Sequence, residues 1–112
     1  MIFTCAGAAY SGQVANRAGS QAAQQGVGKL FCLAATAAGI PDKLERARKA
    51  RLCIGIDGCE DHCCRKVMDK AGLPLNVHVV VTDLGIEKQP ASPRLIMDTK
   101  KVVERIMQEI KG

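Results

Sequence analysis

The stretch IGIDGCEDHCCRK, residues 54–66, contains three of the six cysteines of the chain. A short apolar run ends at Asp57-Gly58, and an apolar run that stops at an Asp-Gly pair is typical of a strand followed by a turn. Two acidic residues follow the first of these cysteines, and acidic residues favour the beginning of a helix. The stretch therefore predicts a strand over residues 52–56, a turn, and a helix over residues 60–71.

The same alternation of strand and helix extends in both directions along the chain. Strands are predicted over residues 1–4, 27–31, 52–56 and 77–81, and helices over residues 12–25, 33–39, 42–50, 60–71 and 94–111. Four alternations predict a parallel sheet with right-handed crossovers. The expected fold is α/β, a single small three-layer domain over residues 1–112. Its sheet is four-stranded and mainly parallel, with helices on both faces, Rossmann-like or flavodoxin-like.

Composition restricts the classes of partner. The chain has 112 residues, 47% of them hydrophobic, which is enough for one core. Much of the modest net charge of +5 lies in residues 43–51, which we interpret as a solvated helix face, with a phosphate or an acidic partner as the alternative. One Tyr, two Phe and no Trp leave no aromatic platform for bases, and we expect no nucleic-acid partner.

The cysteine content indicates a chemistry once a compartment is assumed. No apolar segment approaches the ~20 residues of a membrane span, and the first residues lack a basic leader, so we expect no membrane partner and a cytoplasmic protein. In a reducing compartment, six cysteines favour metal or thiol chemistry over structural disulfides.

Four cysteines are expected at one edge of the sheet, because ligands of open parallel sheets bind outside the carboxyl ends of the strands. Cys5 follows the first strand, Cys32 follows the second, and Cys59 lies three residues beyond the third. Cys63 lies four positions after Cys59, about 40° away around a helix. Four thiolates are suited to zinc or to an iron–sulfur cluster. The alternative is that buried cysteines merely act as small hydrophobic residues.

The two other cysteines and four polar residues have less specific interpretations. Cys53, inside a strand, and Cys64, turned by about 100° from Cys63, are expected to pack elsewhere. The four polar residues are Asp57, His62, His78 and Asp83. We expect a turn role for the first, with hydrogen bonds to loop amides or to a ligand as the alternative. We expect a solvent-exposed ring for the second, with metal ligation as the alternative, and a structural role within a strand for the third. The last lies at the same edge and could orient a loop or a bound group.

Several of these segments together resemble the DGC-domain family, whose members are described as zinc-binding proteins. They are Cys5 in its loop, GVGKLFCLA at residues 26–34, IDGCEDHC at residues 56–63 and VTDLGIEK at residues 81–88. The resemblance covers nearly the whole chain. It implies that Cys5, Cys32, Cys59 and Cys63 bind zinc, in one shared site or two, and it implies no particular reaction.

Three functions stay open at this point. The first is zinc binding, where a closed shell of four thiolates indicates a structural, sensing or metal-handling role and an open shell permits Lewis-acid chemistry. The second is thiol or persulfide chemistry, in which Cys59 at a helix N-terminus is activated and Cys63 resolves a mixed disulfide. The third is an iron–sulfur centre. Whether the protein is an enzyme, and which protein partner it has, is left open.

Overall fold

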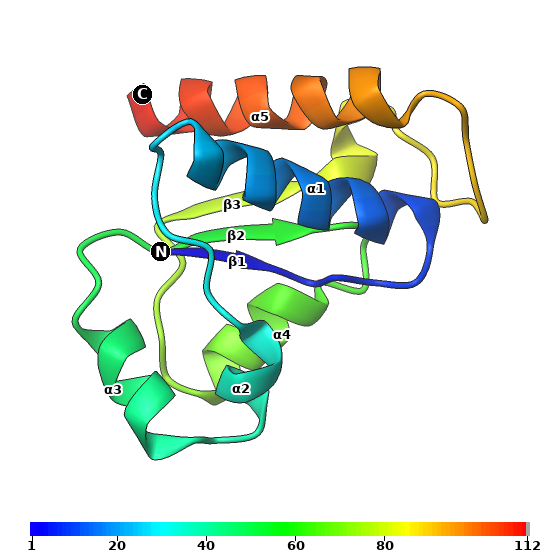
Figure 1. The fold of residues 1–112 in the computed structure, drawn as a ribbon. Helices are drawn as coiled ribbons and strands as arrows, with labels where there is room; N and C mark the ends of the chain where they lie inside the picture. Colours follow the sequence, from blue (N-terminus) through cyan, green and yellow to red (C-terminus); the bar gives the residue numbers. More distant parts are fainter. Residues whose placement is uncertain (112) are drawn as a thin grey trace.

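Three parallel strands form the middle layer of the computed structural model, which describes residues 1–111 (Figure 1). They are β1 (Ile2–Thr4), β2 (Ile54–Asp57) and β3 (Val77–Val80), in that spatial order. The register pairs Phe3 with Gly55, and Gly55 with His78. β2 is buried along its whole length, as a central strand with helices on both faces should be.

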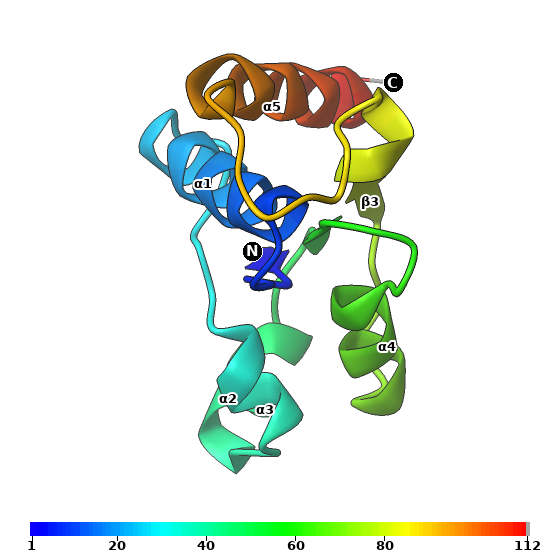
Figure 2. The same ribbon diagram turned by 90° about the vertical axis from the view of Figure 1, so that its right-hand side faces the viewer.

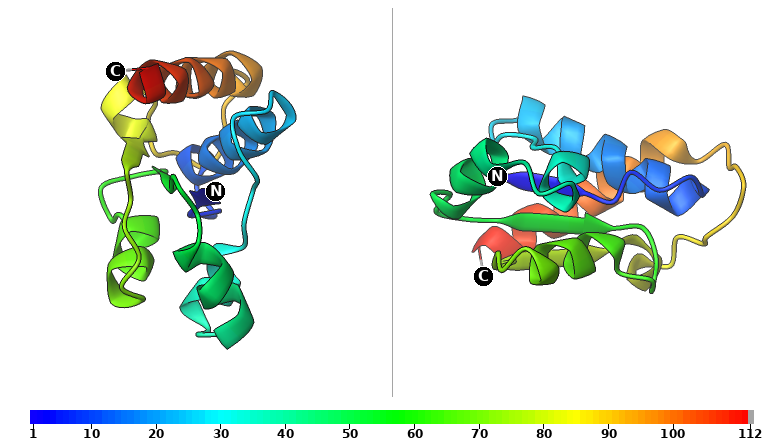
Figure 3. Two further views of the ribbon diagram at one scale, coloured as in Figure 1. Left: turned by 90° about the vertical axis from the view of Figure 1, so that its left-hand side faces the viewer. Right: turned by 90° about the horizontal axis from the view of Figure 1, so that it is seen from below.

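Helices cover both faces of this sheet, as Figures 1 and 2 show. One face is covered by α1 (Tyr10–Gln24) and α5 (Leu95–Lys111). The other face carries α2 (Leu33–Ala37), α3 (Pro41–Arg48) and α4 (Cys63–Lys70). The two further views of Figure 3 agree with this division into three layers. The expected α/β architecture with helices on both faces is therefore confirmed.

The prediction of a four-stranded sheet is wrong. Within residues 1–111 the sheet has three strands, and the segment predicted as the second strand, residues 27–31, contributes one isolated bridge from Leu30 to Ile2. Ile2 N donates to Lys29 O at 2.7 Å, and Phe31 N donates to Ile2 O at 2.8 Å. The segment lies at the open edge beside β1, directly follows Gly26 and contains Gly28, and glycine weakens a strand. Pairing therefore ends after one residue.

The core is divided by the sheet into an upper and a lower part. In the upper part, α1 packs small residues such as Ala15, Ala18 and Ala22 against the strands, so that the helix lies close to the sheet. The lower part contains Cys53 and Cys64, which are 1% and 0% exposed. The prediction that these two cysteines pack away from the candidate site is confirmed. Among the described helices, none is both long and apolar enough to cross a bilayer.

Candidate functional site

Three cysteines from separate parts of the chain line one cavity of about 570 Å³. Cys5 follows β1, Cys32 is the residue before α2, and Cys63 is the first residue of α4. The cavity is lined by residues of the edge strand β1, of α1 and of α2 and α4. Figure 1 shows α1 on one face of the sheet and α2 and α4 on the other. The structure thus brings three of the four predicted cysteines to one place.

Cys5 is the most enclosed thiol of the three. Its Sγ accepts a hydrogen bond from Gly58 N at 3.3 Å, which connects the loop after β1 to the loop after β2. Burial raises the pKa of Cys5, and the N–H groups of Gly7 and Gly58 offset part of this effect. At neutral pH Cys5 is therefore a neutral thiol, which must lose its proton before it can bind a metal.

Cys32 and Cys63 lie at the beginnings of two helices. Cys32 is the N-cap of α2, where its Sγ accepts from Ala35 N at 3.4 Å. Cys63 is exposed and begins α4. Both thiols are therefore held by backbone geometry at the edge of the cavity and remain open to reagents.

Asp57 determines where α4 begins. Its carboxylate is 1% exposed and accepts from Cys64 N at 2.6 Å and from Arg65 N at 3.1 Å. His78 Nε2 lies 2.7 Å from the same carboxylate. Asp57 thus acts as a helix cap from the end of β2, where the sequence indicated a turn, with hydrogen bonds to loop amides as the alternative. His78 has the structural role that was predicted, and its partner is Asp57.

The predicted helix over residues 60–71 begins later than expected, at Cys63. His62 has a left-handed backbone with φ of 53°, which interrupts any helix before it. Cys59 consequently does not lie at a helix N-terminus, nor one turn before Cys63 on a common helix. That part of the sequence interpretation is wrong, because the capping carboxylate comes from β2 rather than from the residues next to the helix.

Cys59 faces a different environment from the other three cysteines and does not line the cavity. Lys88 and Asp61 lie beside it, with Lys88 Nζ 3.4 Å from Asp61 Oδ2. Hydrogen bonds to Cys59 and to Asp61 raise the pKa of Lys88. The hydrogen bond from Lys88 lowers the pKa of Asp61. The sequence contains no local signal for this cluster, because Lys88 comes from a distant loop.

The two remaining polar candidates also lie outside the cavity. His62 is half-buried, and its ring packs edge-on against His78 with centroids 5.2 Å apart. Asp83 is exposed on the short 3-10 helix η1 (Val81–Leu84), which follows β3. Neither residue lines the cavity.

A bound metal ion needs several donor side chains close together. Among residues 1–111, no set of three or more Cys, His, Asp or Glu side chains is gathered closely enough to hold one ion. In kind, however, the cavity donors fit zinc, because three of them are cysteine sulfurs, the usual ligands of structural zinc sites. The chain therefore supplies the right chemistry in one cavity without a preformed coordination shell.

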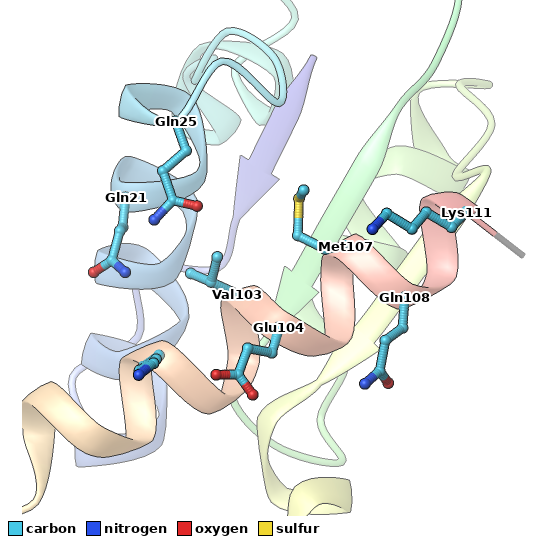
Figure 4. Close-up of a pocket in the computed structure, with 8 residues that line it drawn as sticks. Gln21, Gln25, Val103, Glu104, Met107, Gln108 and Lys111 are labelled. Carbon is cyan, nitrogen blue, oxygen red and sulfur yellow. The ribbon is translucent and has the colours of Figure 1, made fainter.

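A second hollow, of about 430 Å³, lies between α1 and α5 (Figure 4). Its walls include Gln21, Gln25, Glu104, Met107 and Gln108. It contains no thiol or imidazole among the described side chains that line it. This hollow has none of the groups from which the candidate site is built.

The burial of Cys64 makes a prediction for thiol labelling. Burial raises the pKa of Cys64 from the ordinary 9.0 to about 12. At pH 8 the thiolate fraction of Cys64 is therefore about a thousandfold smaller than that of a thiol with the ordinary pKa. We expect iodoacetamide to label Cys64 at least a thousandfold more slowly than the exposed Cys32 in the native protein. Peptide mass spectrometry of timed samples measures this ratio, and labelling in urea provides the control. Equal rates in the native protein would contradict the placement of Cys64 in the core.

The structure therefore defines a small three-layer α/β protein with a thiol-lined cavity at the edge of a parallel sheet. The family model of the DGC domain matches residues 1–110, and the chain belongs to this family. Among curated proteins, it is similar to the anaerobic and virulence modulator AnvM of Pseudomonas aeruginosa. The two are 22% identical over 89 residues, which span 80% of this chain and 68% of AnvM. No solved structure matches the chain significantly.

Proposed function

We propose that the protein binds zinc through cysteine thiolates, with Cys5, Cys32 and Cys63 as ligands from the cavity and Cys59 as the fourth. The observation that supports the proposal is the meeting of three thiols from three separate segments in one cavity. Family membership adds Cys59, which is part of the Asp-Gly-Cys motif. No single stretch of the chain could assemble this set without the fold.

The chemistry of the cavity agrees with a sensing or metal-handling role. Zinc bound by four thiolates has no free coordination position, and such closed sites are structural or regulatory rather than catalytic. Because the shell is not preformed, metal binding is coupled to a rearrangement of the chain and to the release of thiol protons. A role in regulation also agrees with the name of its relative AnvM as a modulator.

Metal content after strictly anaerobic purification tests the proposal. We expect one zinc per chain in the wild type and a loss of at least tenfold in affinity when Cys5, Cys32 or Cys63 is replaced by Ser. Cys53→Ser is the matched control, since Cys53 is buried away from the cavity, and it should keep its zinc. A protein that binds no zinc at micromolar concentration would refute the proposal, and visible charge-transfer bands would favour an iron–sulfur centre instead.

Cys59→Ser distinguishes a closed shell of four thiolates from an open shell of the three cavity thiolates. A loss of zinc in this variant supports a closed four-thiolate site. Retention of zinc restricts the site to the three cavity thiols and leaves an open coordination position, which would overturn the assignment of Cys59 as the fourth ligand. Circular dichroism of each variant separates loss of a ligand from loss of the fold.

A second candidate function is thiol redox chemistry at Cys59, supported by the ammonium group of Lys88 beside it. In this function, two thiols reduce oxidised glutathione to two molecules of glutathione and form a Cys59–Cys63 disulfide. Mass spectrometry of the metal-free protein in glutathione buffers tests for this disulfide. A Lys88→Ala variant should form it more slowly, whereas Lys100→Ala, at an exposed position of α5, should behave as the wild type.

A further inference from the structure

The cavity that contains the three thiols is much larger than a metal ion requires. Its volume of about 570 Å³ is on the order of twenty water molecules, at roughly 30 Å³ for each. Pockets that bind small organic molecules occupy roughly 300–1,000 Å³. The dimensions therefore match an organic ligand.

Most of the side chains that line the cavity are apolar, and the polar ones are Thr4, Asn16 and the three cysteines. Leu30, Phe31 and Leu33 come from the segment that crosses the open edge of the sheet, and Val67 comes from α4. Leu30 is 43% exposed, which is unusual for a leucine next to a core. Within residues 1–111, the side chains that line the cavity include no Asp, Glu, Lys, Arg or His. A charged organic ligand would lose its hydration there without gaining a side chain of opposite charge from Asp, Glu, Lys, Arg or His.

One side chain that lines the cavity offers a hydrogen-bond donor in a fixed orientation. Asn16, on α1, lines the cavity, and its Oδ1 accepts from Thr4 Oγ1 at 2.9 Å. This bond fixes the orientation of the amide, so that Nδ2 is the atom that can donate to a ligand. A ligand that uses this donor therefore carries an acceptor such as a carbonyl oxygen.

The apolar surface continues beyond this cavity. A neighbouring cavity of about 450 Å³ shares Ala37 and Val67 with the first and lies among α2, α3 and α4. Leu44 and Ala71 line this continuation, and Lys70 is at its margin. Ala37 thus lines both spaces, and a larger side chain at this position is expected to reduce both.

We propose that the cavity binds a neutral, largely apolar organic molecule that presents one carbonyl-type acceptor to Asn16 Nδ2. Its walls remove the apolar part of the ligand from water, and the amide fixes its orientation. This binding goes beyond the proposed zinc function and does not depend on it, because the walls are formed by the chain alone.

The probe for the test is prodan, a neutral naphthalene dye with one ketone whose emission shifts to the blue in an apolar site. We expect zinc-free protein, treated with chelator, to bind prodan saturably with a micromolar dissociation constant. Ala37→Phe should weaken binding at least tenfold, because the new ring extends from a residue that lines both cavities. Ala38→Phe is the matched control, since Ala38 is the next residue, is exposed and lines neither cavity.

The acceptor is tested separately. Asn16→Leu should weaken prodan by about tenfold, the value of a hydrogen bond that orients a ligand, and should leave N-phenyl-1-naphthylamine, which has no carbonyl, unaffected. The anionic dye ANS should bind more weakly than prodan. Absence of saturable prodan binding, equal binding by Ala37→Phe and Ala38→Phe, or tighter binding of ANS would overturn the proposal.

The two proposals can fail independently. Ala37→Phe is expected to keep all cavity thiols, and therefore its zinc, while it loses prodan. If zinc is absent from every variant and prodan still binds, the zinc function fails and the organic ligand site stands. If zinc binds and prodan does not, the reverse holds.

Discussion

Asp57→Ala is expected to lower the free energy of unfolding by about 3 kcal/mol, measured by urea denaturation. The substitution removes the acceptor of Cys64 N, Arg65 N and His78 Nε2 in a place where the carboxylate is 1% exposed. Loss of a helix cap costs about 1 kcal/mol, and each buried group left without a partner costs about 1–3 kcal/mol. Water that enters the space of the lost carboxylate would hydrogen-bond to some of these groups, so the total cost is smaller than the sum of the separate costs.

The same substitution is expected to change the candidate site, because Asp57 fixes the beginning of α4 and hence the position of Cys63. Zinc affinity should therefore fall even though no thiol is removed. Asp57→Asn keeps the size of the side chain but only one acceptor oxygen, and it should be less destabilising than Ala. Asp83→Ala, on the exposed surface, is the control and should lie within about 0.5 kcal/mol of the wild type. An unfolding curve of Asp57→Ala that coincides with that of the wild type would refute the capping role.

The approach of Cys5 and Cys32 could be anticipated from the sequence alone, whereas Cys63 was expected there as the partner of Cys59 on one helix, which does not form. Once strand and helix alternate, parallel topology places the residues that follow each strand at one edge. Cys32 reaches the cavity even though the segment before it forms one bridge instead of a strand. The reason is that Lys29 and Phe31 still make two hydrogen bonds with β1. The binding of zinc by these thiols stays a prediction.

The position of Cys59 could not be anticipated, because local and distant signals compete at the start of α4. Acidic residues before Cys63 suggest a helix that begins at residue 60. In the structure, Asp61 instead pairs with Lys88, 27 residues further on. The capping carboxylate comes from Asp57, six residues before the helix begins. Only the approach of separate segments in three dimensions determines which carboxylate serves the helix.

Gly58→Ala is the second substitution with a large expected effect, and its reason is space rather than backbone conformation, since Gly58 does not have a left-handed φ. A Cβ at this position would lie 2.6 Å from Gly12 N, 2.7 Å from Gly12 Cα and 2.8 Å from the carbonyl carbon of Ser11. All three are backbone atoms at the beginning of α1 and cannot turn aside. We expect a destabilisation of about 3 kcal/mol in urea denaturation, at the upper end for overpacking.

The displaced loop should also disturb Cys5, because Gly58 N is the donor to its Sγ. Burial is the main cause that raises the pKa of Cys5, and loss of the Gly58 hydrogen bond would remove part of what offsets it. The pKa should rise further, and alkylation of Cys5 at pH 8 should slow. Gly28→Ala is the matched control, since a Cβ there would lie 3.4 Å from Ile2 Cγ1, an ordinary contact. Equal stability of the two glycine variants would show that the loop of the Asp-Gly-Cys motif can move away from α1 at little cost, and that the close approach of Gly58 does not hold Cys5 in the cavity.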